Sequence, residues 1–190
     1  MEASGAAFCS GTFGPVPDLV VSGINPGHNT GRSVLFSSTV GAILAARVAG
    51  VGGLAVSCGF APRHRYDTAT AVTTRIVDWM TATGAVGLSL NINVPDLDLT
   101  ALGGIRITTL ATKSMFTLRF SRDTEGMHLH RDHRRAGFPP GSDSAAVADG
   151  CVSLTALSGV EADNGALADA DTRAQLETSI LDAIRLAALP

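Results

Sequence analysis

The chain has 190 residues, which is long enough for one domain with a sizeable hydrophobic core. Hydrophobic residues make up 45% and charged residues 16%, and this composition excludes a disordered chain. The formal net charge of −3, with a single short basic cluster at residues 128–135, leaves no footprint for nucleic acid. Three widely spaced cysteines form no CxxC pair or disulfide framework, so we expect a reduced, cytoplasmic protein.

The first half of the chain alternates strand and helix patterns. Ser37-Ser38-Thr39 opens an apolar helical run as an N-cap would, and Gly50 is a typical stop. Pro95 ends a strand of alternating residues. The predicted strands cover 18–21, 54–57 and 88–94, and the predicted helices cover 40–50 and 69–83. Strands alternating with helices predict an α/β fold with a largely parallel sheet.

The stretch 40–61 is apolar and long enough for us to consider a membrane span. It contains Arg47 and five glycines, however, and a helix, a glycine turn and a short strand account for it better. We therefore expect no membrane association.

The second half of the chain has a different character. Residues 105–110 and 115–120 have β-like patterns, and 151–154 is a further short strand. The polar stretch 128–142 is rich in glycine and proline and is predicted to be a loop. Residues 172–189 have apolar side chains at helical spacing. We expect a β-rich arm and a C-terminal helix.

The segment SGINPGHNTG, residues 22–31, follows the first predicted strand. Ligands of open α/β sheets lie outside the carboxyl ends of the strands. Asn25 and Asn29 offer neutral oxygen ligands, and the helix start at 37–39 suits an anion such as phosphate. Together they suggest phosphoryl chemistry beside a hard cation. The alternative is an ordinary loop followed by an ordinary helix cap.

Three stretches, in this order, closely resemble the SurE survival protein family. They are PDLVVSGINPGHNTGRSVLFSSTVGA, NINVPD at 91–96 and PPGSDSAAVADGCVSLTAL at 139–157, and the resemblance spans roughly residues 4–157. It implies a three-layer Rossmann-like fold in one domain, with an α/β core at 1–104, an arm region at 105–157 and a tail at 158–190. It also implies a metal-dependent phosphatase that hydrolyses nucleoside 5'/3'-monophosphates, and a dimer or tetramer.

The same resemblance assigns roles to particular residues. Asn25 would be a ligand of a divalent metal, Mg²⁺ or Mn²⁺. Ser37 and Thr39, with the backbone of Ser38, would hold the phosphate, although the family usually has glycine at position 38. The residues that would shape the pocket are Gly23, Gly27 and Asn29.

The chain departs from the family at its front. SurE proteins begin with a strand that ends in Asn-Asp-Asp-Gly and whose aspartates hold the metal, and this chain contains no Asp-Asp pair. We therefore expect an N-terminally truncated SurE fold with an exposed strand at 18–22 and, if these 190 residues are the whole protein, little or no phosphatase activity. One alternative is a non-catalytic, degenerate SurE-like subunit that binds an anion or a protein partner. Another is a sugar- or nucleotide-binding module.

Other titratable residues suggest further sites. His128, His130 and His133 form an H-x-H-x-x-H pattern, which is either a zinc site or, as we expect among neighbouring arginines, a solvated loop. Asp143 is expected to order the turn at 141–142. His28 is expected at the rim of the glycine-rich loop.

Overall fold

A computed structural model describes residues 9–60, 64–113, 115–134 and 136–159. The expected C-terminal helix at 172–189 lies outside the described residues. The strands are β1 (Leu19–Pro26), β2 (Gly52–Cys58), β3 (Ser89–Val94), β4 (Ile105–Ile107), β5 (Phe116–Arg122), β6 (Met127–His133) and β7 (Val152–Ala156). The α-helices are α2 (Ser38–Val48), α3 (Tyr66–Thr83) and α4 (Asp143–Ala148), and the 3₁₀ turns are η1 (Gly31–Phe36), η2 (Ala85–Gly87) and η3 (Leu99–Ala101).

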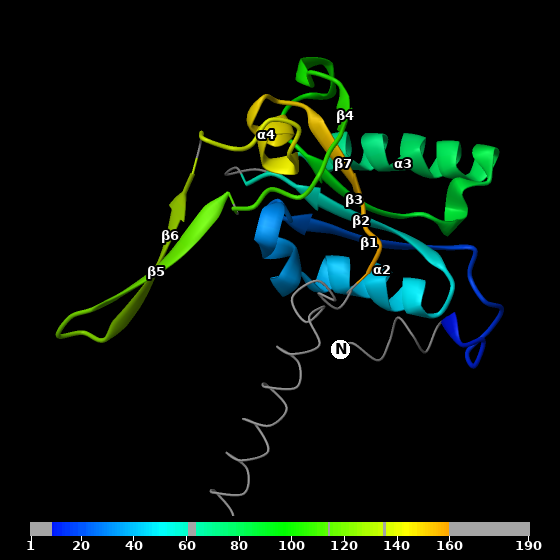
Figure 1. The fold of residues 1–190 in the computed structure, drawn as a ribbon, viewed down its shortest axis with the longest axis horizontal. Helices are drawn as coiled ribbons and strands as arrows, with labels where there is room; N and C mark the ends of the chain where they lie inside the picture. Colours follow the sequence, from blue (N-terminus) through cyan, green and yellow to red (C-terminus); the bar gives the residue numbers. More distant parts are fainter. Residues whose placement is uncertain (1–8, 61–63, 114, 135, 160–190) are drawn as a thin grey trace, which may run out of the picture. The chain divides into compact units, whose positions relative to one another are not determined.

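The central sheet has the order β1-β2-β3-β7-β4. Strands β1, β2 and β3 are parallel, β7 is antiparallel to β3, and β4 is parallel to β7. Helix α2 covers one face of the sheet and α3 the other (Figure 1). The predicted three-layer α/β fold with a mostly parallel sheet is confirmed.

Apolar side chains of the two helices fill the two faces of the sheet. On one face, Val72, Ile76 and Met80 of α3 pack in a cluster with buried residues of β2 and β3. On the other face, Val40 and Ile43 of α2 pack against the middle of β2. Every residue of β2 and β3 is buried, as expected for central strands covered on both sides.

Helix α2 begins and ends where the sequence predicts. Ser37 is its N-cap, and the Ser37 Oγ accepts a hydrogen bond from the backbone N–H of Val40 at 3.2 Å. Gly50, with φ +81°, follows its C-terminal end. The described part of the apolar stretch, residues 40–60, thus contains a helix and a strand, and no helix within the described residues is both long and apolar enough to cross a membrane.

The prediction of a loop at 128–142 is wrong over its first six residues, which belong to strand β6. Strand β6 pairs antiparallel with β5, with Phe120 opposite Leu129, and the two strands form a separate two-stranded arm (Figure 1). Apolar Met127 and Leu129 alternate with polar neighbours along β6, which is strand periodicity on a largely polar segment. The strand predicted at 105–110 is also shorter, because β4 ends at Ile107.

Candidate functional site

A row of polar side chains crosses the sheet near the carboxyl ends of its parallel strands. Asn25 of β1 is in register with Ser57 of β2, Ser57 with Asn93 of β3, and Asn93 with Ser153 of the antiparallel strand β7. Residues 27–30 follow β1 directly at this edge, and Asn29 lies within them. The topology therefore gathers amides and hydroxyls from four strands beside one loop, where open α/β sheets bind ligands.

Asn29 is the centre of this polar network. Its Nδ2 donates to the Ser57 Oγ at 2.7 Å and to the Asn25 Oδ1 at 3.1 Å. Its backbone N–H donates to the Asn93 Oδ1 at 2.7 Å, and its carbonyl accepts from the Nδ2 atoms of Asn91 and Asn93 at 2.8 and 3.2 Å. Asn29 is only 8% exposed, so these bonds hold the loop firmly against the sheet.

Four members of the network were not identified as site residues from the sequence: Ser57, Asn91, Asn93 and Ser153. Asn91 and Asn93 stand in the NINVPD motif, so the N-x-N spacing at a strand end was the available signal. Ser57 and Ser153 lie in apolar strands and have no such local signal.

The donor set of this network does not form a complete divalent-metal site. The Oδ1 of Asn25 already accepts hydrogen bonds from the Ser57 Oγ at 3.0 Å and from Asn29. Every side chain in the network is neutral, whereas Mg²⁺ and Mn²⁺ prefer carboxylate oxygens. Across the described residues, no three His, Cys, Asp or Glu side chains come together as metal ligands. Asn25 alone would supply a single weak ligand.

The start of α2 presents hydroxyls and backbone N–H groups. Ser37 and Thr39 are half-buried and Ser38 is exposed. Since the first N–H groups of a helix have no intrahelical partner, those of Ser38 and Thr39 are available to an anion. The helix has 11 residues, enough for its dipole to favour a negative charge at this end.

Gly23 and Gly27 are required by the backbone around the loop. Their φ values are +127° and +96°, which L side chains rarely adopt. A Cβ on Gly23 would collide with the Val56 carbonyl oxygen, and one on Gly27 would collide with the Phe60 ring. These glycines therefore allow the loop to lie close against β2 and the residues that follow it.

Asp143 is buried and bonds to distant segments, so the predicted role in the turn at 141–142 is wrong. Its Oδ2 accepts from the backbone N–H of Gly31 at 2.8 Å. Its Oδ1 accepts from the N–H groups of Ala111 and Ser144 at 2.9 and 2.6 Å. The side chain is 0% exposed. This carboxylate joins the start of α4 to η1 and to the segment after β4.

His28 packs against the sheet and is half-buried. Its Nε2 lies 3.1 Å from the carbonyl oxygen of Val94, the last residue of β3. Burial lowers the pKa of His28 to about 4, and this outweighs the opposite effects of that hydrogen bond and of Asp96. The ring is therefore neutral at pH 7, and its Nε2–H donates to Val94.

The three arm histidines do not converge on a zinc site. The His128 Nε2 lies 3.0 Å from Asp123, and the His130 Nε2 lies 2.6 Å from the Ser121 Oγ. His133 is an odd number of residues further along β6, so it faces the opposite side of the arm. Strand alternation thus separates His133 from His128 and His130, so the H-x-H-x-x-H pattern does not bring three ligands together.

The comparisons with known proteins agree with this geometry. Residues 4–117 match the family model described as survival protein SurE. Relatives named 5'/3'-nucleotidase SurE are 42% identical over 151 residues in Klebsiella pneumoniae strain 342 and 43% identical over 148 residues in Escherichia coli O127:H6. Each alignment covers 75% of this chain and 58% of the relative, so the chain spans little more than half the length of these proteins.

A solved structure supports the same relationship. The crystal structure of the SurE protein from Aquifex aeolicus matches with a TM-score of 0.71 and 27% sequence identity. The match covers 82% of this chain and 66% of the other. The family match over more than half of the residues and the shared fold lead to one conclusion: the chain belongs to the SurE family.

Proposed function

We propose that this chain binds the phosphate of a nucleoside monophosphate, or of another phosphomonoester, and hydrolyses it to the alcohol and inorganic phosphate. The observation that carries the proposal is the position of the α2 start, which follows a loop held at the carboxyl edge of the sheet by the Asn29 network. Relatives named 5'/3'-nucleotidase SurE support this class of substrate.

In this proposal, Ser37, Ser38 and Thr39 hold the phosphate oxygens through their hydroxyls and the free N–H groups of the first turn. Gly23, Gly27 and Asn29 position the preceding loop. Because an anion and a helix N-terminus attract one another, phosphate binding requires no charged side chain at this point.

Asn25 is proposed as one ligand of a divalent cation, Mg²⁺ or Mn²⁺. The described residues bring no carboxylate into its network, so they do not complete the site, and we derive no catalytic step through a metal. This same observation favours a second candidate function. The chain would then be a non-catalytic SurE-like subunit that binds an anion or a protein partner.

The experiment compares two helix-cap variants. Ser37→Ala removes the cap of α2, and Ser142→Ala removes the equivalent cap of α4, whose Oγ accepts from the N–H of Ala145. Each substitution should cost about 1 kcal/mol of stability. Only Ser37→Ala should weaken phosphate binding and slow the hydrolysis of AMP and p-nitrophenyl phosphate, measured with Mn²⁺ or Mg²⁺ present.

The outcomes separate the two functions. Metal-dependent hydrolysis that Ser37→Ala reduces and Ser142→Ala retains supports the phosphatase. Phosphate binding that is lost in Ser37→Ala, without any hydrolysis by the folded chain, supports the non-catalytic subunit. Equal effects of the two cap variants on binding would reject the α2 start as the phosphate site.

We also propose a cytoplasmic location and a homodimer or homotetramer. The described cysteines, Cys9, Cys58 and Cys151, are free thiols, which fits a reducing compartment. Light scattering coupled to size-exclusion chromatography measures the oligomeric state directly. A strictly monomeric chain at micromolar concentration would contradict the proposed homodimer or homotetramer.

A further inference from the structure

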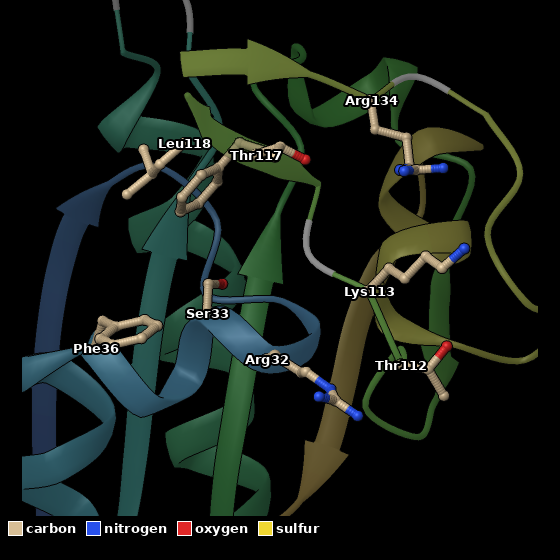
Figure 2. A pocket seen from close by; sticks show the side chains of 9 residues that line it. Arg32, Ser33, Phe36, Thr112, Lys113, Thr117, Leu118 and Arg134 are labelled. Atoms are coloured by element: carbon tan, nitrogen blue, oxygen red, sulfur yellow. The ribbon is translucent and has the colours of Figure 1, made fainter. Parts of the chain in front are cut away.

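A cavity of about 370 Å³ lies between η1 and the base of the arm. Three basic side chains line it: Arg32 from η1, Lys113 from the segment before β5, and Arg134 just after β6. Their nitrogen-bearing ends lie on one side of the cavity, with Phe36 and Leu118 on the other (Figure 2). Three segments distant in sequence thus bring positive charge to one place.

None of these three cations forms a salt bridge in the part of the chain that the structure describes. Arg65, Arg106 and Arg119, by contrast, each pair with an aspartate. Among the described residues, no Asp or Glu lines the cavity. Like charges gathered around one cavity repel one another, and a bound anion would relieve that repulsion.

The cavity walls restrict the kind of anion. Guanidinium groups bind phosphate through paired N–H donors, and a lysine adds a point charge. The opposite side carries the apolar side chains of Phe36 and Leu118, and Phe36 is 89% exposed. The Phe116 ring also lines the cavity. The volume falls within the range of small-molecule sites.

We propose that this cavity is a second phosphate-binding site, specific for a small phosphorylated molecule with an aromatic or apolar part. The phosphate contacts Arg32, Lys113 and Arg134, and the apolar part packs on Phe36 and Leu118. None of Ser37, Ser38 or Thr39 lines the cavity. The site therefore adjoins the start of α2 at Phe36 without including its hydroxyls, and it does not depend on the proposed phosphatase activity.

The test is an NMR titration of the full chain with phenylphosphonate, whose C–P bond resists phosphatases. Amide shifts of Lys113, Thr117 and Arg134 report this cavity, and those of Ser38 and Thr39 report the α2 start. We expect saturable shifts at the cavity amides. Lys113→Ala and Arg134→Ala should each weaken that binding about three- to tenfold, since exposed charged contacts contribute modestly.

Matched controls make the result specific. Arg75→Ala removes the same charge from an exposed position on α3, away from the cavity, and should leave the affinity unchanged. Inorganic phosphate should bind the cavity several-fold more weakly than phenylphosphonate, because it leaves the apolar wall uncovered.

Several results would overturn the proposal. One is an absence of saturable shifts at the cavity amides. Another is an affinity for phenylphosphonate in the Lys113→Ala and Arg134→Ala variants that equals that of the parent chain. The third is an equal affinity of the cavity for inorganic phosphate and phenylphosphonate. Shifts confined to Ser38 and Thr39 would reject this second site while leaving the α2 site intact. Shifts confined to the cavity amides would support the second site and would show that this probe does not bind at the α2 start.

Discussion

At the scale of single residues, Asp143 joins the start of α4 to two distant segments of the chain. Its carboxylate accepts three backbone hydrogen bonds and is fully buried. In Asp143→Asn an amide NH₂ would face a backbone N–H, leaving buried donors unsatisfied. We expect the free energy of unfolding to fall by about 2–4 kcal/mol, measured by urea denaturation.

A matched substitution gives the baseline for this prediction. Asp149→Asn makes the same chemical change at an exposed carboxylate that pairs with Arg106 at 2.6 Å. Exposed ion pairs contribute little, so the expected loss is below about 1 kcal/mol. Similar losses in the two variants would show that the buried hydrogen bonds of Asp143 do not anchor the fold.

The lowered pKa of His28 predicts that the free energy of unfolding depends on pH. Its pKa in the folded chain, about 4, lies below the ordinary value of 6.5, so the unfolded chain binds the proton first as the pH falls. Stability is therefore unaffected above pH 6.5 and decreases between pH 6.5 and 4, by at most about 3 kcal/mol. Replacing His28 by Gln should flatten this part of the pH profile, measured by urea denaturation at several pH values.

The control is His130→Gln, on the arm, where the same substitution lies outside the core. This variant should retain the decrease in stability between pH 6.5 and 4. If His28→Gln retains it to the same extent, other groups are responsible for the acid sensitivity.

Residues whose roles were predicted from the sequence bond to near neighbours in the chain, whereas residues whose roles were not predicted bond to partners far away in the sequence. The cap at Ser37 depends on a neighbour three residues away and was predicted. Asp143 bonds to Gly31, 112 residues away, and to Ala111, 32 residues away, and no local pattern encodes such pairings. Ser57 joins its network through a partner 28 residues distant and was likewise missed.

At the scale of elements, the arm carries its large apolar side chains on one face, the apolar face, together with Arg122 and His133. Leu118, Phe120, Met127 and Leu129 lie on the apolar face and are 47–70% exposed. An isolated two-stranded hairpin is marginally stable, and such a face favours contact with another protein surface. We expect the paired substitution of Phe120 and Leu129 by Glu to shift the assembly toward monomer in light scattering.

The control for this prediction lies on the opposite face of the same strands. Ser121 and His128 are opposite one another there, so Ser121→Glu adds negative charge to the arm without touching its apolar face. That variant should retain the assembly of the parent chain. If the Phe120 and Leu129 variant assembles like the parent chain, the arm is not part of the interface.

The elements themselves were predicted where local signals are strong. The start of α2 and the strand before Pro95 agree with the sequence patterns because a cap and a helix breaker mark them. β6 was predicted as a loop because histidines and arginines mask its period of two, and its pairing with β5 supplies the stability that its composition lacks.

At the scale of the whole described unit, helices cover both faces of the sheet, but its edge strand β1 is left uncovered. Strand β1 is the first strand of the order β1-β2-β3-β7-β4, and within the described residues it pairs only with β2. Val21 on this strand is 50% exposed. An apolar edge strand of eight residues is a template for pairing with another chain.

This edge leads to the last prediction. Val21→Lys places a charge on the exposed side of β1 and should slow aggregation, measured as turbidity at 37 °C. Since Val21 is half exposed, the free energy of unfolding should change by only about 0.5–1 kcal/mol. Val48→Lys makes the same change on the last turn of α2, where the side chain is 91% exposed and belongs to a helix instead of the edge strand. Equal slowing by both variants would mean that added charge alone improves solubility, whereas slowing by Val21→Lys alone identifies the edge of β1 as the surface through which the chains associate.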